Sequence, residues 1–438
     1  MPIDYLIKPG GNLRGRLRVP GDKSISHRAV ILASLAQGVS HISGLLQGED
    51  VLATVAAFRA MGVHIEGPQD GQATIEGAGM HGLQPPVAPL DMGNSGTAMR
   101  LLAGVLAAQR FDSKLVGDAS LQRRPMRRVT EPLISMGAMI ATAQDGRPPL
   151  SISGGRALHG IDYVMPVASA QVKSALLLAG LYAKGTTSLT EPAVTRDHTE
   201  RMLRAFGYAV ESEGRRVRIL GGGKLFGCEM PVPGDLSSAA FFLVGAAIAS
   251  EADLLLEGIG VNPTRTGIIE LLQRMGAAIA VSSRGEVGGE PVADIRVRSS
   301  KLRGIVIDRD DVSRSIDEFP ALFVAAACAE GQTVLRGAEE LRVKESDRIA
   351  VMAEGLTQLG VDAREQPDGI TIRGSGLSGG HVQSHGDHRV AMAFAVAALA
   401  AGGTIIVHDC KNVNTSFPGF AMLASQAGLP VEVEESAE

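Results

Sequence analysis

The chain has 438 residues, of which 45% are hydrophobic and 20% charged, so it is too apolar for a disordered chain and long enough for more than one domain. The formal net charge is −5 and aromatic residues make up only 3%, with no Trp. Surfaces that bind nucleic acid are basic and often carry stacking rings, so this composition argues against a nucleic-acid partner. A site for anions must therefore be local.

The cysteines and the apolar segments indicate the compartment. Cys228, Cys328 and Cys410 are widely spaced and form no CxxC motif, which is too few for a disulfide framework. Residues 1–5 show no signal-peptide pattern. The most apolar stretches, 241–249 and 390–401, are too short for membrane spans. We expect a cytoplasmic protein that does not bind a membrane.

An internal repeat runs along the chain. Six amphipathic segments each end in glycine and continue into a short apolar strand pattern, and the glycines lie 75, 70, 69, 84 and 68 residues apart. Glycine just past a helix is a common left-handed stop signal, so the pattern predicts six amphipathic helices. The glycines are Gly62, Gly137, Gly207, Gly276, Gly360 and Gly428.

A second marker precedes each of these glycines by about 40 residues and opens a helix rich in Ala, Leu and Val. The six predicted starts lie at 23–26, 94–97, 169–171, 235–238, 317–318 and 387–389. After the first turn these helices are apolar on nearly all sides, which indicates burial. Each unit is therefore predicted as strand, buried helix, strand, amphipathic helix, strand and strand.

Six βαβαββ units divide most simply into two domains of three. We expect a two-domain inside-out α/β barrel, with the buried helices inside and the sheets around them. The seam is predicted near residues 230–234, which makes 21–234 the first domain. Residues 1–20 hold a strand-like segment but no complete unit, so they are expected to complete the second domain, 235–438.

Cationic side chains stand at some of the predicted helix starts. A helix start carries free N–H groups and a partial positive charge, so Lys23 and Arg28 are unfavourable there unless an anion binds. The glycine-flanked segment 93–100 would let a ligand approach the backbone, and the loop 122–128 holds four Arg. Polar helix starts are more often simple caps, and a basic loop is often only solvated, so both alternatives stay open.

The densest charge cluster holds Lys344, Glu345 and Arg348. If a helix begins near Lys344, then Lys344 and Arg348 lie on one face with Glu345 beside them, although a surface ladder of ion pairs would have the same spacing. Arg389 repeats a cation at the next helix start. With Asp317, these residues suit a substrate that carries several anionic groups and leave two carboxylates for proton transfer. We find no metal-site or cofactor motif and expect neither.

Together these segments resemble the 5-enolpyruvylshikimate-3-phosphate synthase family of enolpyruvyl transferases, over essentially the whole chain. The segments that carry the resemblance are 20–28, 93–100, 124–125, 169–171, 317–318 and 342–348. It implies transfer of the enolpyruvyl group of phosphoenolpyruvate to the 5-hydroxyl of shikimate 3-phosphate, through a tetrahedral adduct. It also implies two domains with the active site in the cleft between them. We further expect a monomer and inhibition by glyphosate.

The resemblance also implies residue roles. Around shikimate 3-phosphate it places Lys23, Ser24, Arg28, Ser169, Ala170, Gln171, Arg196, Asp317 and Lys344. Around phosphoenolpyruvate it places Lys23, Asn94, Gly96, Arg124, Gln171, Arg348 and Arg389. The expected catalytic groups are Asp317 as the base for the 5-hydroxyl, Glu345 as the acid for the methylene carbon, and Lys23.

The chain departs from the family pattern at a few positions. Ala170 stands where many members have a second Ser, so the sugar phosphate is expected to rely more on Arg196. Thr415 stands where many members have Lys, with Lys411 four residues earlier. Gly96 keeps the small residue that the family associates with glyphosate sensitivity.

Two other functions are compatible with parts of the pattern. UDP-N-acetylglucosamine enolpyruvyl transferase typically has Lys-Asn near its N-terminus and often a Cys in the loop before the second helix, whereas here Ser24 follows Lys23 and residues 117–128 hold no Cys. A non-catalytic anion-binding protein of the same fold would need the phosphate-holding residues but not Asp317 and Glu345.

Overall fold

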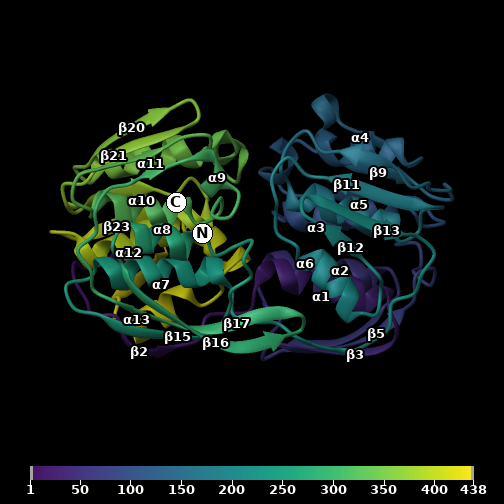
Figure 1. Ribbon diagram of the computed structural model, residues 1–438, viewed down its shortest axis with the longest axis horizontal. Coiled ribbons are helices and arrows are strands. Elements are labelled where there is room, and N and C mark those ends of the chain that lie inside the picture. The colour runs from purple at the N-terminus through teal and green to yellow at the C-terminus, as the bar shows by residue number, and fades with distance from the viewer. Residues whose placement is uncertain (1–2, 436–438) are drawn as a thin grey trace. The chain divides into compact units, whose positions relative to one another are not determined.

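The computed structural model describes residues 3–435 and divides the chain into two compact units (Figure 1). Unit 1 comprises Met1–Pro20, Pro233–Gly285 and Pro291–Glu438, and unit 2 comprises Gly21–Val232 and Glu286–Glu290. The short piece of unit 2 near residue 288 is the turn of a hairpin whose two strands pair in a sheet of unit 1.

Unit 2 contains three sheets, ordered β14-β3-β5-β4, β6-β7-β9-β8 and β10-β11-β13-β12. Their strands are β3 (Gln37–Ser43), β4 (His64–Gln69), β5 (Gln72–Ala78), β6 (Leu90–Asp91), β7 (Ser113–Val116), β8 (Met139–Thr142), β9 (Leu150–Ser153), β10 (Asp162–Val164), β11 (Thr186–Thr190), β12 (Glu211–Glu213), β13 (Arg216–Leu220) and β14 (Glu229–Pro231). Each sheet has one parallel pair at an edge, followed by antiparallel pairs.

Six α-helices complete unit 2. They are α1 (Lys23–Leu35), α2 (Glu49–Ala60), α3 (Gly96–Leu106), α4 (Arg127–Ser135), α5 (Ala170–Gly180) and α6 (His198–Ala205), with short 3-10 turns η1 (Leu121–Arg123) and η2 (Gln144–Gly146). Helix α3 packs against both α1 and α5. Helices α2 and α6 pack on α1, and α4 packs on α5.

Unit 1 repeats this architecture with sheets ordered β16-β17-β15-β2, β18-β19-β21-β20 and β22-β23-β1-β24. Its strands are β1 (Ile3–Ile7), β2 (Arg14–Leu17), β15 (Asp253–Gly260), β16 (Ala278–Val287), β17 (Glu290–Arg298), β18 (Val306–Ile307), β19 (Gln332–Leu335), β20 (Asp362–Gln366), β21 (Gly369–Arg373), β22 (Gly380–Gln383), β23 (Ile405–His408) and β24 (Val431–Glu435). The first two strands of the chain thus complete two sheets whose other strands come much later in the sequence.

The helices of unit 1 are α7 (Leu236–Ile248), α8 (Gly267–Arg274), α9 (Arg309–Val312), α10 (Phe319–Ala327), α11 (Arg348–Gln358), α12 (His388–Ala397) and α13 (Phe420–Ala427), with 3-10 turns η3 (Glu339–Val343), η4 (Ala398–Ala400) and η5 (Lys411–Thr415). Helices α7, α10 and α12 pack against one another, and Figure 1 shows them grouped inside the unit.

Burial of apolar side chains explains why these helices lie inside. The phenylalanines of α7 and α10 are at most 2% exposed, and each unit has its own continuous hydrophobic core. A helix that is apolar on all sides removes the most surface from water when other elements cover it completely. The predicted fold class, a two-domain α/β fold of βαβαββ repeats with buried helices, is confirmed.

The six glycines used to find the repeat all have positive φ, between +81° and +106°. At each of them a helix ends and the chain turns into the following strand or loop. Glycine adopts this left-handed conformation without the steric cost that other residues meet. The repeat visible in the sequence is therefore a repeat of helix ends.

One local expectation is wrong. The segment before Arg348 is not a helix that begins near Lys344: residues 339–343 form the turn η3, Lys344 is extended, and α11 begins at Arg348. The side chain of Asp347 accepts a hydrogen bond from the backbone N–H of Ala350 at 3.0 Å, which caps α11. Because an aspartate can accept this bond and a lysine cannot, the helix starts directly after Asp347 rather than near Lys344.

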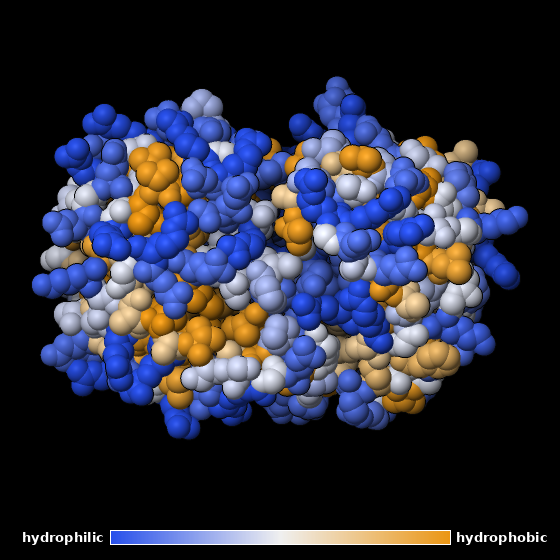
Figure 2. Space-filling model, in the orientation of Figure 1, coloured by the Kyte–Doolittle hydropathy of each residue, from blue (hydrophilic) through white to orange (hydrophobic). Residues whose placement is uncertain are grey.

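The surface of the visible face is mainly hydrophilic, with separate hydrophobic patches (Figure 2). The large exposed apolar side chains come from different elements and include Val87, Val164, Phe226 and Met422. Scattered apolar side chains of this kind are normal on a protein surface. None of the helices formed by residues 3–435 combines the length and the apolar character needed to cross a bilayer.

Candidate active site

The starts of the buried helices are capped. In five of the six, within residues 3–435, a side-chain oxygen at the N-cap accepts a hydrogen bond from a backbone N–H of the first turn. The capping residues are Asp22, Ser95, Ser169, Asp235 and Asp387. The alternative that polar residues at these helix starts are caps is therefore correct. Any role in binding a ligand comes in addition to the cap.

In unit 2, Arg28 is the centre of a buried group at the start of α1. Its Nε donates to Thr199 Oγ1 at 2.7 Å, its NH2 donates to Ser174 Oγ at 2.7 Å, and its NH1 donates to the Ser24 carbonyl at 2.8 Å. Burial lowers the pKa of Arg28 to about 10, Glu200 opposes this shift, and the positive charge of Arg196 adds to it. Arg28 and Arg196 are therefore close enough to repel each other, an arrangement that an anionic ligand would relieve.

Lys23 forms an ion pair that the sequence did not indicate. Its Nζ lies 3.0 Å from Oδ2 of Asp50, which belongs to the first turn of α2, and both side chains are largely buried. Asp50 offsets the unfavourable position of a cation at a helix start.

A second group of unit 2 surrounds the start of α3. Arg124 NH2 donates to Asn94 Oδ1 at 2.6 Å, and Arg100 NH1 donates to Gln171 Oε1 at 2.5 Å. A Cβ added at Gly96 would lie 3.0 Å from NH1 of Arg100 and 3.2 Å from NH1 of Arg124. Glycine therefore lets two guanidinium groups approach the backbone closely.

Ala170 and Gln171 link the two groups of unit 2. The Ala170 carbonyl accepts from Ser174 Oγ at 2.6 Å, next to Arg28, and Gln171 Nε2 donates to Thr97 Oγ1 at 2.9 Å, next to Gly96. The start of α5 thus contacts both groups, and Ser169 caps the same helix.

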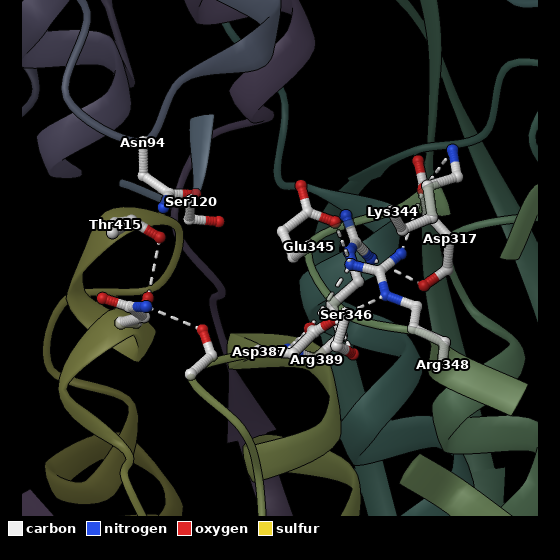
Figure 3. A network of polar contacts seen from close by, with 12 residues as sticks. Asn94, Ser120, Asp317, Lys344, Glu345, Ser346, Arg348, Asp387, Arg389 and Thr415 are labelled. Atoms are coloured by element: carbon white, nitrogen blue, oxygen red, sulfur yellow. Dashed lines mark hydrogen bonds and ion pairs between the residues drawn. The ribbon is translucent and has the colours of Figure 1, made fainter. Parts of the chain in front are cut away.

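In unit 1, Arg348 brings the two candidate carboxylates together (Figure 3). Its NH2 lies 2.7 Å from Glu345 Oε2, and its NH1 lies 3.5 Å from Asp317 Oδ1. Lys344 Nζ lies 3.6 Å from the same Asp317 oxygen. Arg389 donates from NH1 to the backbone carbonyl of Asp317 at 2.9 Å. All five of the expected site residues that belong to unit 1 are therefore neighbours.

Asp387 is the strongest partner of Arg348. Its Oδ2 lies 2.8 Å from Arg348 Nε and also accepts from Ser346 Oγ at 3.0 Å, while its Oδ1 caps α12. Burial disfavours the charge of Arg348, but Asp387 and Glu345 outweigh burial and raise the pKa of the guanidinium. Burial likewise opposes ionisation of Asp387, and Arg348 outweighs it and lowers the pKa of that carboxyl. Both groups are thus charged.

Sequence reasoning placed the expected residues in two groups but missed three of their partners. Asp50, Arg100 and Asp387 were given no role in the sequence analysis. Arg100 lies in a segment that carries the family resemblance, and Asp387 lies in a segment that marks a helix start. The only signal in the sequence for Asp50 and Asp387 was that each cation at a helix start needs a negatively charged partner.

The departure at residue 415 has a local explanation. Thr415 is 4% exposed, and its hydroxyl donates to the Asn412 carbonyl at 2.7 Å within η5. Lys411, at the start of the same turn, is exposed. The two side chains therefore occupy different environments.

Within residues 3–435, no group of three or more His, Cys, Asp or Glu side chains is placed to hold a metal ion. The cationic groups at the helix starts instead suit anionic ligands.

Comparisons with known proteins agree with one another. A family model described as EPSP synthase (3-phosphoshikimate 1-carboxyvinyltransferase) matches residues 7–423. A protein of Acidithiobacillus ferrooxidans named 3-phosphoshikimate 1-carboxyvinyltransferase is 67% identical over 429 residues, which cover 98% of this chain and 99% of that protein. One of the same name from Alkalilimnicola ehrlichii is 64% identical over 428 residues, covering 98% and 96%. The solved structure of EPSP synthase from Acinetobacter baumannii is 56% identical, with a TM-score of 0.89 and coverage of 99% of this chain and 100% of that chain.

Replacing Asp387 with Asn tests the buried pair. Arg348 would lose its most deeply buried counter-charge, so we expect the free energy of unfolding to fall by about 3 kcal/mol at neutral pH. Because the pKa of Asp387 is lowered on folding, its contribution is present above pH ~4 and is lost as pH falls through the folded-state pKa. The difference between variant and wild type should therefore shrink in acid.

Denaturant unfolding at several pH values measures this difference. Ser346→Ala, which removes only one hydrogen bond to Asp387, is the control and should cost about 1 kcal/mol. Equal stability of Asp387→Asn and wild type at neutral pH would contradict the pairing.

Proposed function

The chain belongs to the EPSP synthase family and transfers the enolpyruvyl group of phosphoenolpyruvate to the 5-hydroxyl of shikimate 3-phosphate, and we propose that the charged groups of both units carry out this reaction together. The reaction releases phosphate and is a step of the shikimate pathway, which leads to chorismate and the aromatic amino acids. UDP-N-acetylglucosamine enolpyruvyl transfer is not favoured by the comparisons.

The proposed substrate contacts divide between the units. For shikimate 3-phosphate they are Lys23, Ser24, Arg28, Ser169, Ala170, Gln171 and Arg196 of unit 2 with Asp317 and Lys344 of unit 1. For phosphoenolpyruvate they are Lys23, Asn94, Gly96, Arg124 and Gln171 of unit 2 with Arg348 and Arg389 of unit 1. Both substrates are anionic, and buried or helix-start cations are costly unless an anion compensates them. Since each proposed set of substrate contacts includes residues of both units, we propose that the reaction takes place in the cleft between the domains.

The contact of Arg348 with both Asp317 and Glu345 is the observation that carries the proposed chemistry. One guanidinium orients two carboxylates whose side chains are 17% and 23% exposed, so both are accessible to a substrate. Two groups are needed because the 5-hydroxyl must lose a proton as its oxygen bonds to C2, while C3 gains a proton.

The steps then balance. Asp317 accepts the hydroxyl proton and Glu345 supplies the proton to C3, which gives the tetrahedral adduct. In the second step C3 returns its proton to Glu345, and the bond from C2 to the phosphate oxygen breaks. The proton held by Asp317 passes to the departing phosphate, so the enol ether and phosphate leave with both carboxyl groups restored. Lys23, Lys344 and the arginines stabilise the negative charge of the adduct because they are already oriented before it forms.

A non-catalytic anion-binding protein of the same fold is the second candidate. It would need the cations, but nothing in such a function requires two accessible carboxylates on one arginine. The monomeric state, the cytoplasmic location and inhibition by glyphosate stay predictions.

Turnover in the presence of two acceptors tests the proposal. We expect phosphate release from phosphoenolpyruvate with shikimate 3-phosphate and none with UDP-N-acetylglucosamine. In the same assay, Asp317→Asn and Glu345→Gln should each lower kcat by about 10²–10⁴-fold, the usual contribution of a general acid or base. Asp310→Asn, at an exposed position of α9, is the matched control and should keep wild-type kcat. Full activity of both site variants would favour the binding protein.

Gly96→Ala tests the environment of phosphoenolpyruvate. The new methyl group would meet NH1 of Arg100 and of Arg124, which must then move by a few tenths of an ångström. We expect the inhibition constant of glyphosate to rise on the order of tenfold, with a smaller change in kcat. An unchanged inhibition constant, measured at saturating shikimate 3-phosphate, would contradict this expectation.

A further inference from the structure

A buried charged cluster of unit 2 lies next to the Arg28 group but has no part in the chemistry described so far. It consists of Lys173, Glu191 and Glu200, which are 1%, 4% and 3% exposed. Lys173 Nζ lies 2.8 Å from Glu200 Oε1 and 3.0 Å from Glu191 Oε2. Burial disfavours the charge of Lys173, but the two carboxylates outweigh burial and raise its pKa. A buried ion cluster often adds little to the free energy of unfolding. Stability alone therefore does not explain why these three charged residues lie here.

The cluster joins helices α5 and α6 beside Arg28. Lys173 is followed in α5 by Ser174, and Glu200 is preceded in α6 by Thr199. The ion pair between Lys173 and Glu200 therefore lies next to the hydrogen bond that Thr199 Oγ1 donates to Ser174 Oγ at 2.7 Å. Both hydroxyls accept a hydrogen bond from the Arg28 guanidinium. The spacing of the two helices thus sets the position of Arg28.

The same lysine also anchors the segment that carries Arg196. Lys173 Nζ donates to the backbone carbonyl of Thr195 at 3.3 Å, and the Thr195 hydroxyl donates to Glu191. Thr195 directly precedes Arg196 and is 6% exposed. Lys173 therefore contacts helix α6, which accepts a hydrogen bond from Arg28, and also the segment that carries Arg196.

We propose that Lys173, held by Glu191 and Glu200, is a positioning residue that sets Arg28 and Arg196 at the separation needed to bind shikimate 3-phosphate. This rests on the proposed function, which assigns both arginines to that substrate. Lys173 does not touch the substrate: it fixes two like charges close together before the ligand arrives, so that less ordering is needed on binding.

Steady-state kinetics of Lys173→Met and Glu191→Gln test the proposal. Glu191→Gln keeps the shape of the side chain and leaves Lys173 paired with Glu200, so it tests the cluster even if Lys173→Met does not fold. In both variants we expect KM for shikimate 3-phosphate to rise on the order of tenfold. KM for phosphoenolpyruvate and kcat, measured at saturating shikimate 3-phosphate, should stay within about twofold.

Two controls separate positioning from a general loss of stability. Leu177→Ala opens a cavity at a fully buried position of the same helix, and Lys184→Met makes the same chemical change at an exposed position. Neither should change KM for shikimate 3-phosphate. An equal rise of KM in Leu177→Ala, or an unchanged KM in the folded cluster variants, would overturn the proposal. If the wild-type protein itself shows no turnover with shikimate 3-phosphate, the proposed function fails instead.

Discussion

Cations at helix starts are the constraint on which the site depends. The helix dipole and burial both oppose a positive charge there, so each cation needs a compensating group. Asp50 supplies it for Lys23, and Asp387 supplies it for Arg348. Arg28 differs, since its hydrogen bonds go to two hydroxyls and a carbonyl. Because the chain has cations at these unfavourable positions, its helix starts are suited to anionic substrates.

The carboxylates around Arg348 divide into two kinds. Asp387 is fully buried, caps α12 and holds the guanidinium, which makes it a fixed counter-charge. Asp317 and Glu345 contact the same guanidinium from more exposed positions. Because the fixed partner compensates Arg348, we propose that the two partly buried carboxylates, Asp317 and Glu345, exchange protons with a substrate. In unit 2, we propose that the cluster around Lys173 similarly positions Arg28 and Arg196, the cations that bind shikimate 3-phosphate. The cluster itself does not contact that substrate.

The fold could be predicted in some detail because its signals are local. A glycine after each amphipathic helix and a polar residue before each buried helix mark the repeat, and both follow from backbone conformation and capping. The start of α11 was placed wrongly because Asp347 competes successfully as the cap. The partners Asp50 and Asp387 could not be identified, since they lie 27 and 39 residues from the cations they compensate and sequence spacing does not specify such contacts.

A structure determined with shikimate 3-phosphate and phosphoenolpyruvate, or an unreactive analogue of the latter, tests the central claim most directly. We expect one bound pair of ligands that contacts Lys23, Arg28 and Arg124 from unit 2 and Lys344 and Arg389 from unit 1. Ligands that contact the residues of one unit alone would contradict the claim that cations of both units bind one pair of substrates.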